Sequence, residues 1–105
     1  MNKTERRYSQ YLEWCKSMGQ IRQWYFEPMK LRLAAKTWYT PDFGVVTNEL
    51  KCEMHEVKGT DKRGKPRFED DARVKLKVAA ELYPQFRFVV TWKVDECWMQ
   101  EVFND

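Results

Sequence analysis

The sequence predicts a small α/β (α+β) protein in which helices cover a mixed β-sheet, and three observations lead to this fold class. A helical pattern opens the chain, several short strand-like segments follow it, and a second helical pattern precedes a strongly apolar strand. The chain has 105 residues, which is enough for one hydrophobic core but not for two. We therefore expect a single domain over residues 1–105.

The first helix is predicted over residues 4–18. Tyr8, Leu12 and Cys15 recur at the spacing of one helical face. Gly19 follows this pattern and is a natural helix terminator.

A group of short strands is predicted after this helix. Residues 21–26 are rich in β-branched and aromatic side chains, which favours a strand. Residues 29–33 alternate between apolar and basic side chains, so they either continue that strand or form a second short one. After a turn, residues 38–47 and 52–58 flank a polar turn at Asn48-Glu49, and together these segments indicate an antiparallel meander.

The second half of the chain contains a loop, a helix and one or two strands. Residues 59–68 have two glycines and a proline and form a loop. Acidic residues open a helix over residues 69–83, and Pro84 closes it. Residues 86–92 predict an apolar strand, whereas residues 97–103 fit either a last strand or a short helix.

The composition excludes several classes of protein. With 43% hydrophobic and 15% aromatic residues, the chain can form a core and is not disordered. No long apolar run and no signal-peptide pattern occur, so we expect a cytoplasmic protein that is neither exported nor membrane-bound. Three widely spaced cysteines and one histidine indicate reduced thiols and argue against a structural zinc site. The net charge of +3 is compatible with nucleic-acid binding without being diagnostic of it.

Two acids and a lysine are predicted to converge on one face of the sheet. If the Asn48-Glu49 turn is centred on residue 49, Asp42 lies directly opposite Glu56. Lys58 lies two residues further along and therefore shares that face. Two carboxylates so close repel each other, and a bound divalent cation removes that cost. The alternative is a solvated face with an ordinary Glu56–Lys58 ion pair.

Two helical residues are further candidates for this site. Glu5 lies at the edge of the first helix's apolar side and is either an additional metal ligand or a capping-box partner of Asn2, as alternative roles. Lys75 projects into the apolar face of the second helix, between Ala79 and Leu82. Its ammonium group either reaches the acidic pair or a phosphate, or extends to solvent at the nearest edge.

The loop that directly follows Lys58 is basic. Its four cations, for which we expect contact with nucleic-acid phosphates, are Lys62, Arg63, Lys65 and Arg67. The alternative is a solvated run of charges. The aromatic side chains are expected mainly to pack in the core and its rim, and Trp38 or Tyr39 is the candidate for stacking on a base. His55 alternates away from the acidic pair and is expected to be structural.

These motifs resemble those of the PD-(D/E)xK nuclease superfamily. The resemblance is carried by YTPDF at residues 39–43 and EVKG at residues 56–59. The order of predicted elements is also similar to the restriction-endonuclease-like αβββαβ core of that superfamily. More narrowly, most of the chain is similar to a family of small phage-encoded proteins that are uncharacterised or assigned as endonucleases. The shared segments are ERRY at 5–8, YTPDF, HEVKG at 55–59, and DDARVKLKVAAELYP at 70–84.

The resemblance implies a set of roles for residues of this chain. Asp42 and Glu56 would bind Mg²⁺, for which Mn²⁺ can substitute, and Lys58 would be the catalytic lysine. Glu5 matches a first-helix glutamate that many members contribute to the metal site, and Lys75 matches a second-helix position that often carries a polar or basic residue.

The implied function is a metal-dependent DNA endonuclease that hydrolyses phosphodiester bonds. Relatives by fold include phage Holliday-junction resolvases and the endonuclease subunit that cuts transposon ends, so branched or structured DNA is the expected substrate. A domain of this size has little area to surround a duplex, which favours a homodimer or a partner protein. If the protein is phage-encoded, it would act in the host cytoplasm. The alternative is a non-catalytic nucleic-acid-binding or phage adaptor module that retains the nuclease fold.

Overall fold

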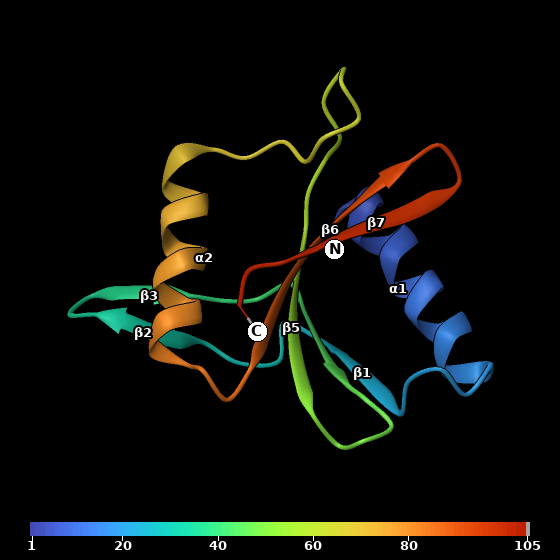
Figure 1. The fold of residues 1–105 in the computed structure, drawn as a ribbon, viewed down its shortest axis with the longest axis horizontal. Coiled ribbons are helices and arrows are strands. Elements are labelled where there is room, and N and C mark those ends of the chain that lie inside the picture. The colour runs from blue at the N-terminus through green and yellow to red at the C-terminus, as the bar shows by residue number, and fades with distance from the viewer. Residues whose placement is uncertain (105) are drawn as a thin grey trace.

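A mixed five-stranded sheet in the order β1-β4-β5-β6-β7 forms the centre of the fold, and β2 and β3 pair separately as a hairpin (Figure 1). The computed structural model describes residues 1–104. Its elements are α1 (Lys3–Ser17), β1 (Gln23–Phe26), β2 (Leu31–Ala34), β3 (Thr37–Tyr39), β4 (Phe43–Val46), β5 (Cys52–Val57), α2 (Asp70–Leu82), β6 (Arg87–Val94) and β7 (Cys97–Val102).

One pair of neighbouring strands makes the sheet mixed. β5 and β6 are parallel, and the other neighbours are antiparallel. A parallel pair needs a crossover connection, which the loop after β5 and the helix α2 provide. Figure 1 shows α1 on one side of the sheet, with α2 and the β2–β3 hairpin on the other. The fold is therefore α+β, with helices on both sides of a mixed sheet, as the sequence predicted.

Alternation along the strands divides the core into two clusters. Phe43 and Val45 of β4 pack with Tyr8 and Leu12 of α1. On the other side of the sheet, residues of β5 and β6 pack with α2 and the hairpin; they include Met54, Phe88, Val90, Leu76, Ala79, Leu31 and Tyr39. Because successive side chains of a strand point to opposite faces, the neighbours of Met54 on β5 cannot join its cluster. His55 accordingly lies under α1, as expected.

The strand predictions need one correction. Residues 38–47 do not form one strand, because β3 ends at Tyr39 and β4 begins at Phe43. Pro41, which lies between them, cannot donate a ladder hydrogen bond. Consequently β4 pairs with β1, and the β2–β3 hairpin is an insertion that leaves the meander. Residues 29–33 contribute to the separate strand β2, and residues 97–103 form the strand β7 with β6.

The three cysteines have no disulfide partner. Cys15 is buried on the inner face of α1, whereas Cys52 and Cys97 are exposed at the beginnings of β5 and β7. None of the helices within residues 1–104 has the length and apolar character needed to cross a membrane.

Candidate functional site

The register between β4 and β5 brings Asp42 to the level of Glu56. Phe43 lies opposite His55 in this antiparallel pair, which is the register predicted from a turn centred on residue 49. The same register extended by one residue sets Asp42 against Glu56. The amide of Val57 donates a hydrogen bond of 2.8 Å to Oδ2 of Asp42, which ties this carboxylate to the end of β5. The predicted register of this hairpin is therefore confirmed, and the acidic pair lies just beyond the last residue pair of β4 and β5.

The surroundings of Asp42 disfavour its charged form. The pKa of Asp42 is raised from 3.8 to about 8. Burial is the largest cause of this rise, and the negative charge of Glu56 is the second. The hydrogen bond from the Val57 amide opposes the shift, whereas the charge of Glu5 and a hydrogen bond with it add to the rise. A divalent cation beside these oxygens would favour the ionised form instead.

Glu56 is held by one hydrogen bond and one ion pair. The Tyr39 hydroxyl donates to Oε1 across 2.9 Å, and Nζ of Lys58 lies 3.2 Å from Oε2. Burial, followed by the charges of Glu56 and Asp42, raises the pKa of Tyr39 well above its usual range, so this phenol stays protonated and donates. The Glu56 and Lys58 side chains are only 14% and 18% exposed, which rules out a solvated face.

Lys58 also packs against an aromatic ring at the end of the following loop. Its ammonium nitrogen lies 5.4 Å from the centroid of Phe68, within the range of a cation–π contact. Its backbone amide donates to the carbonyl of Thr91 across 2.9 Å, which continues the pairing of β5 with β6. Lys58 is therefore oriented from its backbone and on two sides of its side chain.

Glu5 closes the capping box that the sequence offered as one of its two alternative roles, and its carboxyl group also lies near Asp42. Its Oε1 accepts from the Asn2 amide across 2.9 Å, and its own amide donates to Oδ1 of Asn2 across 2.8 Å, which is a complete capping box. The same carboxyl group contributes to the raised pKa of Asp42 by charge and by hydrogen bonding. The capping-box role is therefore confirmed. Whether Glu5 binds a metal stays a prediction.

Lys75 lies at the border of the buried side of α2. Leu76, Ala79 and Ala80 are buried, and the centre of the stripe they define lies about 90° around the helix from Lys75 and further from Leu82. Leu82, which was expected on the apolar face, is 50% exposed. Lys75 is half-buried, and its role at the site stays a prediction.

The basic loop after β5 is closed by its own hydrogen bonds. Thr60 and Pro66 form an isolated bridge, and Oδ1 of Asp61 accepts from the amides of Arg63 and Lys65 across 2.8 and 2.9 Å. The indole of Trp92 donates to the carbonyl of Gly64 across 2.9 Å, which attaches the loop to β6. Figure 1 shows the loop rising beyond the end of β5. The four cations predicted to contact phosphates are all exposed; they are Lys62, Arg63, Lys65 and Arg67.

No family model, curated protein or solved structure matches this chain. The function must therefore be inferred from the residues themselves.

The carboxylate oxygens of Asp42 and Glu56 are the type of ligand that hard cations such as Mg²⁺ prefer. Among the side chains that the structure describes, no group of three or more His, Cys, Asp or Glu residues is arranged to hold a metal ion. Mg²⁺, however, usually keeps several waters and binds proteins through one or two carboxylates together with substrate phosphates. Asp42 and Glu56 are the two residues that could serve in this way.

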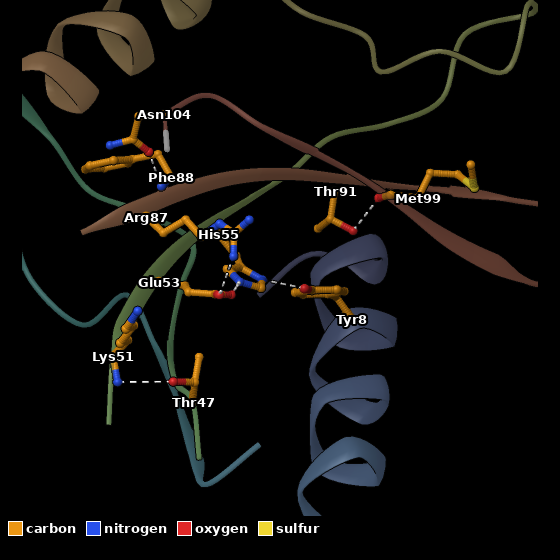
Figure 2. A network of polar contacts seen from close by, with 10 residues as sticks. All are labelled: Tyr8, Thr47, Lys51, Glu53, His55, Arg87, Phe88, Thr91, Met99 and Asn104. Carbon is orange, nitrogen blue, oxygen red and sulfur yellow. Dashed lines mark hydrogen bonds and ion pairs between the residues drawn. The ribbon is translucent and has the colours of Figure 1, made fainter. Parts of the chain in front are cut away.

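A second polar network lies on the opposite face of β5, under α1 (Figure 2). Nδ1 of His55 is hydrogen-bonded to the Tyr8 hydroxyl, and Nε2 is 2.9 Å from Oε1 of Glu53. Burial raises the pKa of Tyr8 far above its usual range, and the hydrogen bond with His55 lowers the pKa of Glu53. An ionised Glu53 can only accept, so Nε2–H of His55 donates to it. Nη1 of Arg87 lies 3.9 Å from Oε2 of Glu53.

The sequence alone did not reveal the residues that hydrogen-bond to Glu56 on one face of β5 and to His55 on the other. Tyr39 was considered only as a base-stacking candidate, although its place three residues before Asp42 was a signal that it lies near the acidic pair. The Tyr8–His55 contact joins residues 47 positions apart, and only the packing of α1 on the sheet reveals it.

Proposed function

We propose that this protein is a Mg²⁺- or Mn²⁺-dependent DNA endonuclease of the PD-(D/E)xK type. The main support is the β4–β5 register, which sets Asp42 against Glu56 at the end of the paired region. The order α1, β1, β4, β5, α2, β6, once the inserted hairpin is set aside, agrees with an αβββαβ core. A protein that only binds nucleic acid has no need for a buried acidic pair that repels itself.

The residues of this site would divide the work of phosphodiester hydrolysis. A bound Mg²⁺ would supply a Lewis acid for the phosphate and an activated water. Asp42 and Glu56 would hold it, and Tyr39 keeps Glu56 in place through Oε1. Lys58, whose Nζ lies 3.2 Å from Oε2 of Glu56, would orient the water or offset the negative charge that develops on the phosphate. Glu5 would position a water or complete the ligand set.

A non-catalytic nucleic-acid-binding or adaptor module is the second candidate. The observation that favours it is the state of Glu56, because Tyr39 and Lys58 already contact its two oxygens. A metal ligand in this position would have to share those oxygens or exchange one contact.

The proposal extends to the state and setting of the protein. Cutting both strands of a duplex or a junction would require a homodimer or a partner protein. A cytoplasmic setting, the host's if the protein is phage-encoded, would agree with three unpaired cysteines.

Plasmid and four-way-junction cleavage, with and without Mg²⁺ or Mn²⁺, tests the proposal. We expect cleavage only with metal, and its loss in Asp42→Ala and Lys58→Ala. Glu101→Gln and Lys51→Ala are matched controls, because both residues are exposed and lie outside the site. Cleavage that persists in both site variants would identify a contaminant or another site. Binding without cleavage in either metal would favour the adaptor.

A further inference from the structure

The β2–β3 hairpin has one packed face and one uncovered face. Leu31 and Tyr39 are buried against α2 and the sheet. Arg32 and Trp38 lie directly opposite each other across the two strands, and both are exposed. Partners in a strand pair point to the same face, so the guanidinium and the indole share the outer side of the hairpin.

The exposed side of this hairpin is basic. Residues 28–40 contain three cations and no Asp or Glu. The cations Lys30, Arg32 and Lys36 are exposed, and none of them forms an ion pair with the side chains that the structure describes. A positive surface of this kind is complementary to an anionic polymer.

Trp38 lies on the face of the hairpin that is not packed against the core. Its side chain is 50% exposed, whereas the hairpin is fixed from its other face. The Tyr83 hydroxyl at the end of α2 donates to the carbonyl of Arg32 across 2.7 Å, and Leu31 is buried. A half-exposed indole on a hairpin that is anchored from its other face is a suitable platform for a planar, apolar surface such as a base.

The hairpin is joined directly to the candidate active site. Trp38 precedes Asp42 by four residues, so at most about 14 Å of extended chain separates their Cα atoms. That is roughly four steps of 3.4 Å along one DNA strand. Tyr39, the next residue, points inward to Glu56. Figure 1 shows the hairpin extending away from the five-stranded sheet on the side of α2.

We propose that the outer face of the β2–β3 hairpin binds single-stranded nucleic acid, with Trp38 stacking on an unpaired base. Arg32, Lys30 and Lys36 contact the phosphates on either side of that base. A duplex conceals the faces of its bases, whereas a branch, gap or flap exposes them. The inference rests on the proposed nuclease in one respect, since it identifies the unpaired segment of the substrate a few nucleotides from the cut.

Fluorescence anisotropy of a labelled oligo(dT) strand in EDTA tests this surface without cleavage. We expect the single strand to bind more tightly than a duplex of equal length. Trp38→Ala should weaken binding at least about fivefold, as for loss of one stacked base, and Trp38→Phe should keep most of it. Arg32→Gln should reduce the slope of log affinity against log salt by roughly 0.7. Trp14→Ala, on α1, is the matched control with an indole that is 52% exposed.

Several results would overturn the inference. These are unchanged affinity in Trp38→Ala, equal losses in the Trp38 and Trp14 variants, a preference for duplex, or binding to anionic vesicles in place of DNA. Failure of the nuclease proposal looks different. Trp38-dependent binding without cleavage in any metal retains this surface and rejects the nuclease. If cleavage depends on Asp42 but the affinity for the oligonucleotide is unchanged in Trp38→Ala, the nuclease proposal is retained and this surface is rejected.

Discussion

The Tyr39 hydroxyl donates a 2.9 Å hydrogen bond to Oε1 of Glu56, and Lys58 contacts the other oxygen of the same carboxylate. Tyr39 ends β3 and Glu56 lies near the end of β5, so the bond joins the inserted hairpin to the central sheet. It therefore couples the orientation of one acid of the candidate site to the packing of the hairpin.

Replacing Tyr39 by Phe should affect both stability and the proposed reaction. The change leaves Oε1 of Glu56 without its donor in a largely buried setting, which costs about 1–3 kcal/mol. Urea unfolding measures this loss. If Glu56 is a ligand, cleavage should also slow through kcat with little change in KM, because the substrate does not need to contact Tyr39.

Tyr83→Phe is the matched control for this prediction. It removes a phenol that donates to the carbonyl of Arg32 and that touches neither acid. It should lower stability by less than Tyr39→Phe, because its hydrogen bond is exposed, and it should not change kcat. Equal effects of the two variants on kcat would show that Tyr39 acts only through general stability.

Asp42→Asn should stabilise the protein in neutral and alkaline solution. The pKa of Asp42 is about 8 in the folded protein and 3.8 ordinarily, so folding takes up a proton between these values. The stability that this group contributes is complete below about pH 4 and is lost as the pH rises through the folded pKa. Asparagine resembles the protonated acid and can still accept from the Val57 amide.

Unfolding measured from pH 4 to pH 9 tests the sign of this effect. Asp42→Asn and the original protein should have similar stability near pH 4. At pH 8 the variant should be more stable by on the order of 2 kcal/mol. This is less than the maximum, which is about 1.4 kcal/mol for each pKa unit between 3.8 and about 8. A variant that is less stable than the original protein at pH 8 would mean that Asp42 is ionised and satisfied there.

Magnesium should stabilise the folded protein, and more strongly as the pH rises. A ligand that binds only the native state adds about 2.7 kcal/mol at one hundred times its Kd. Binding competes with the proton on Asp42, so the Tm shift should grow between about pH 6 and about pH 9. Thermal unfolding at constant ionic strength measures it.

The variants of this metal experiment separate a site from a general salt effect. Asp42→Asn and Glu56→Gln should lose most of the Tm shift, whereas Glu101→Gln, an exposed acid on β7, should keep it. A shift that is equal in all four proteins would reject the acidic pair as the site of binding.

Glu5→Gln separates the two roles of the first-helix glutamate. Glutamine also closes a capping box, so α1 should keep its stability within a few tenths of a kcal/mol. It removes the charge that helps to raise the pKa of Asp42, so that pKa should fall. Nuclear magnetic resonance titration of the Asp42 carboxyl carbon measures the fall. An unchanged titration would mean that the two groups do not interact in solution.

The register of the site could be predicted from the sequence, whereas its neighbours could not. Pairing in a hairpin is fixed once the turn is placed, so the turn at residue 49 was sufficient to set Phe43 opposite His55. The break at Thr40 and Pro41 was hidden because strand-forming residues lie on both sides of it.

Other contacts depend on tertiary packing that local patterns do not contain. The bond between Tyr39 and Glu56 forms only because the detached hairpin packs beside β5. The partners of His55 come from α1 and from its own strand, and alternation could give only the face on which the histidine lies. Leu82 was wrongly placed on the apolar face because the buried stripe of α2 is rotated away from it.

Glu53→Gln should weaken the network under α1 in neutral solution but not in acid. Hydrogen bonding with His55, together with the charges of His55 and Arg87, lowers the pKa of Glu53 below its ordinary 4.5. The stability from this group is therefore present above pH 4.5 and is lost as the pH falls through the lower folded pKa. Glutamine keeps an acceptor for Nε2 of His55 but not the charge, so the loss at pH 7 should be about 1 kcal/mol.

Urea unfolding at pH 7 and pH 3 checks this prediction, and Glu49→Gln, an exposed acid in the β4–β5 turn, is its control. The difference between Glu53→Gln and the original protein should shrink towards pH 3, while the control should match the original protein at both values. DNA cleavage should not change, because Glu53 contacts His55, and His55 contacts Tyr8 of α1, on the face opposite Tyr39. A difference that persists at pH 3 would assign the loss to packing and not to charge.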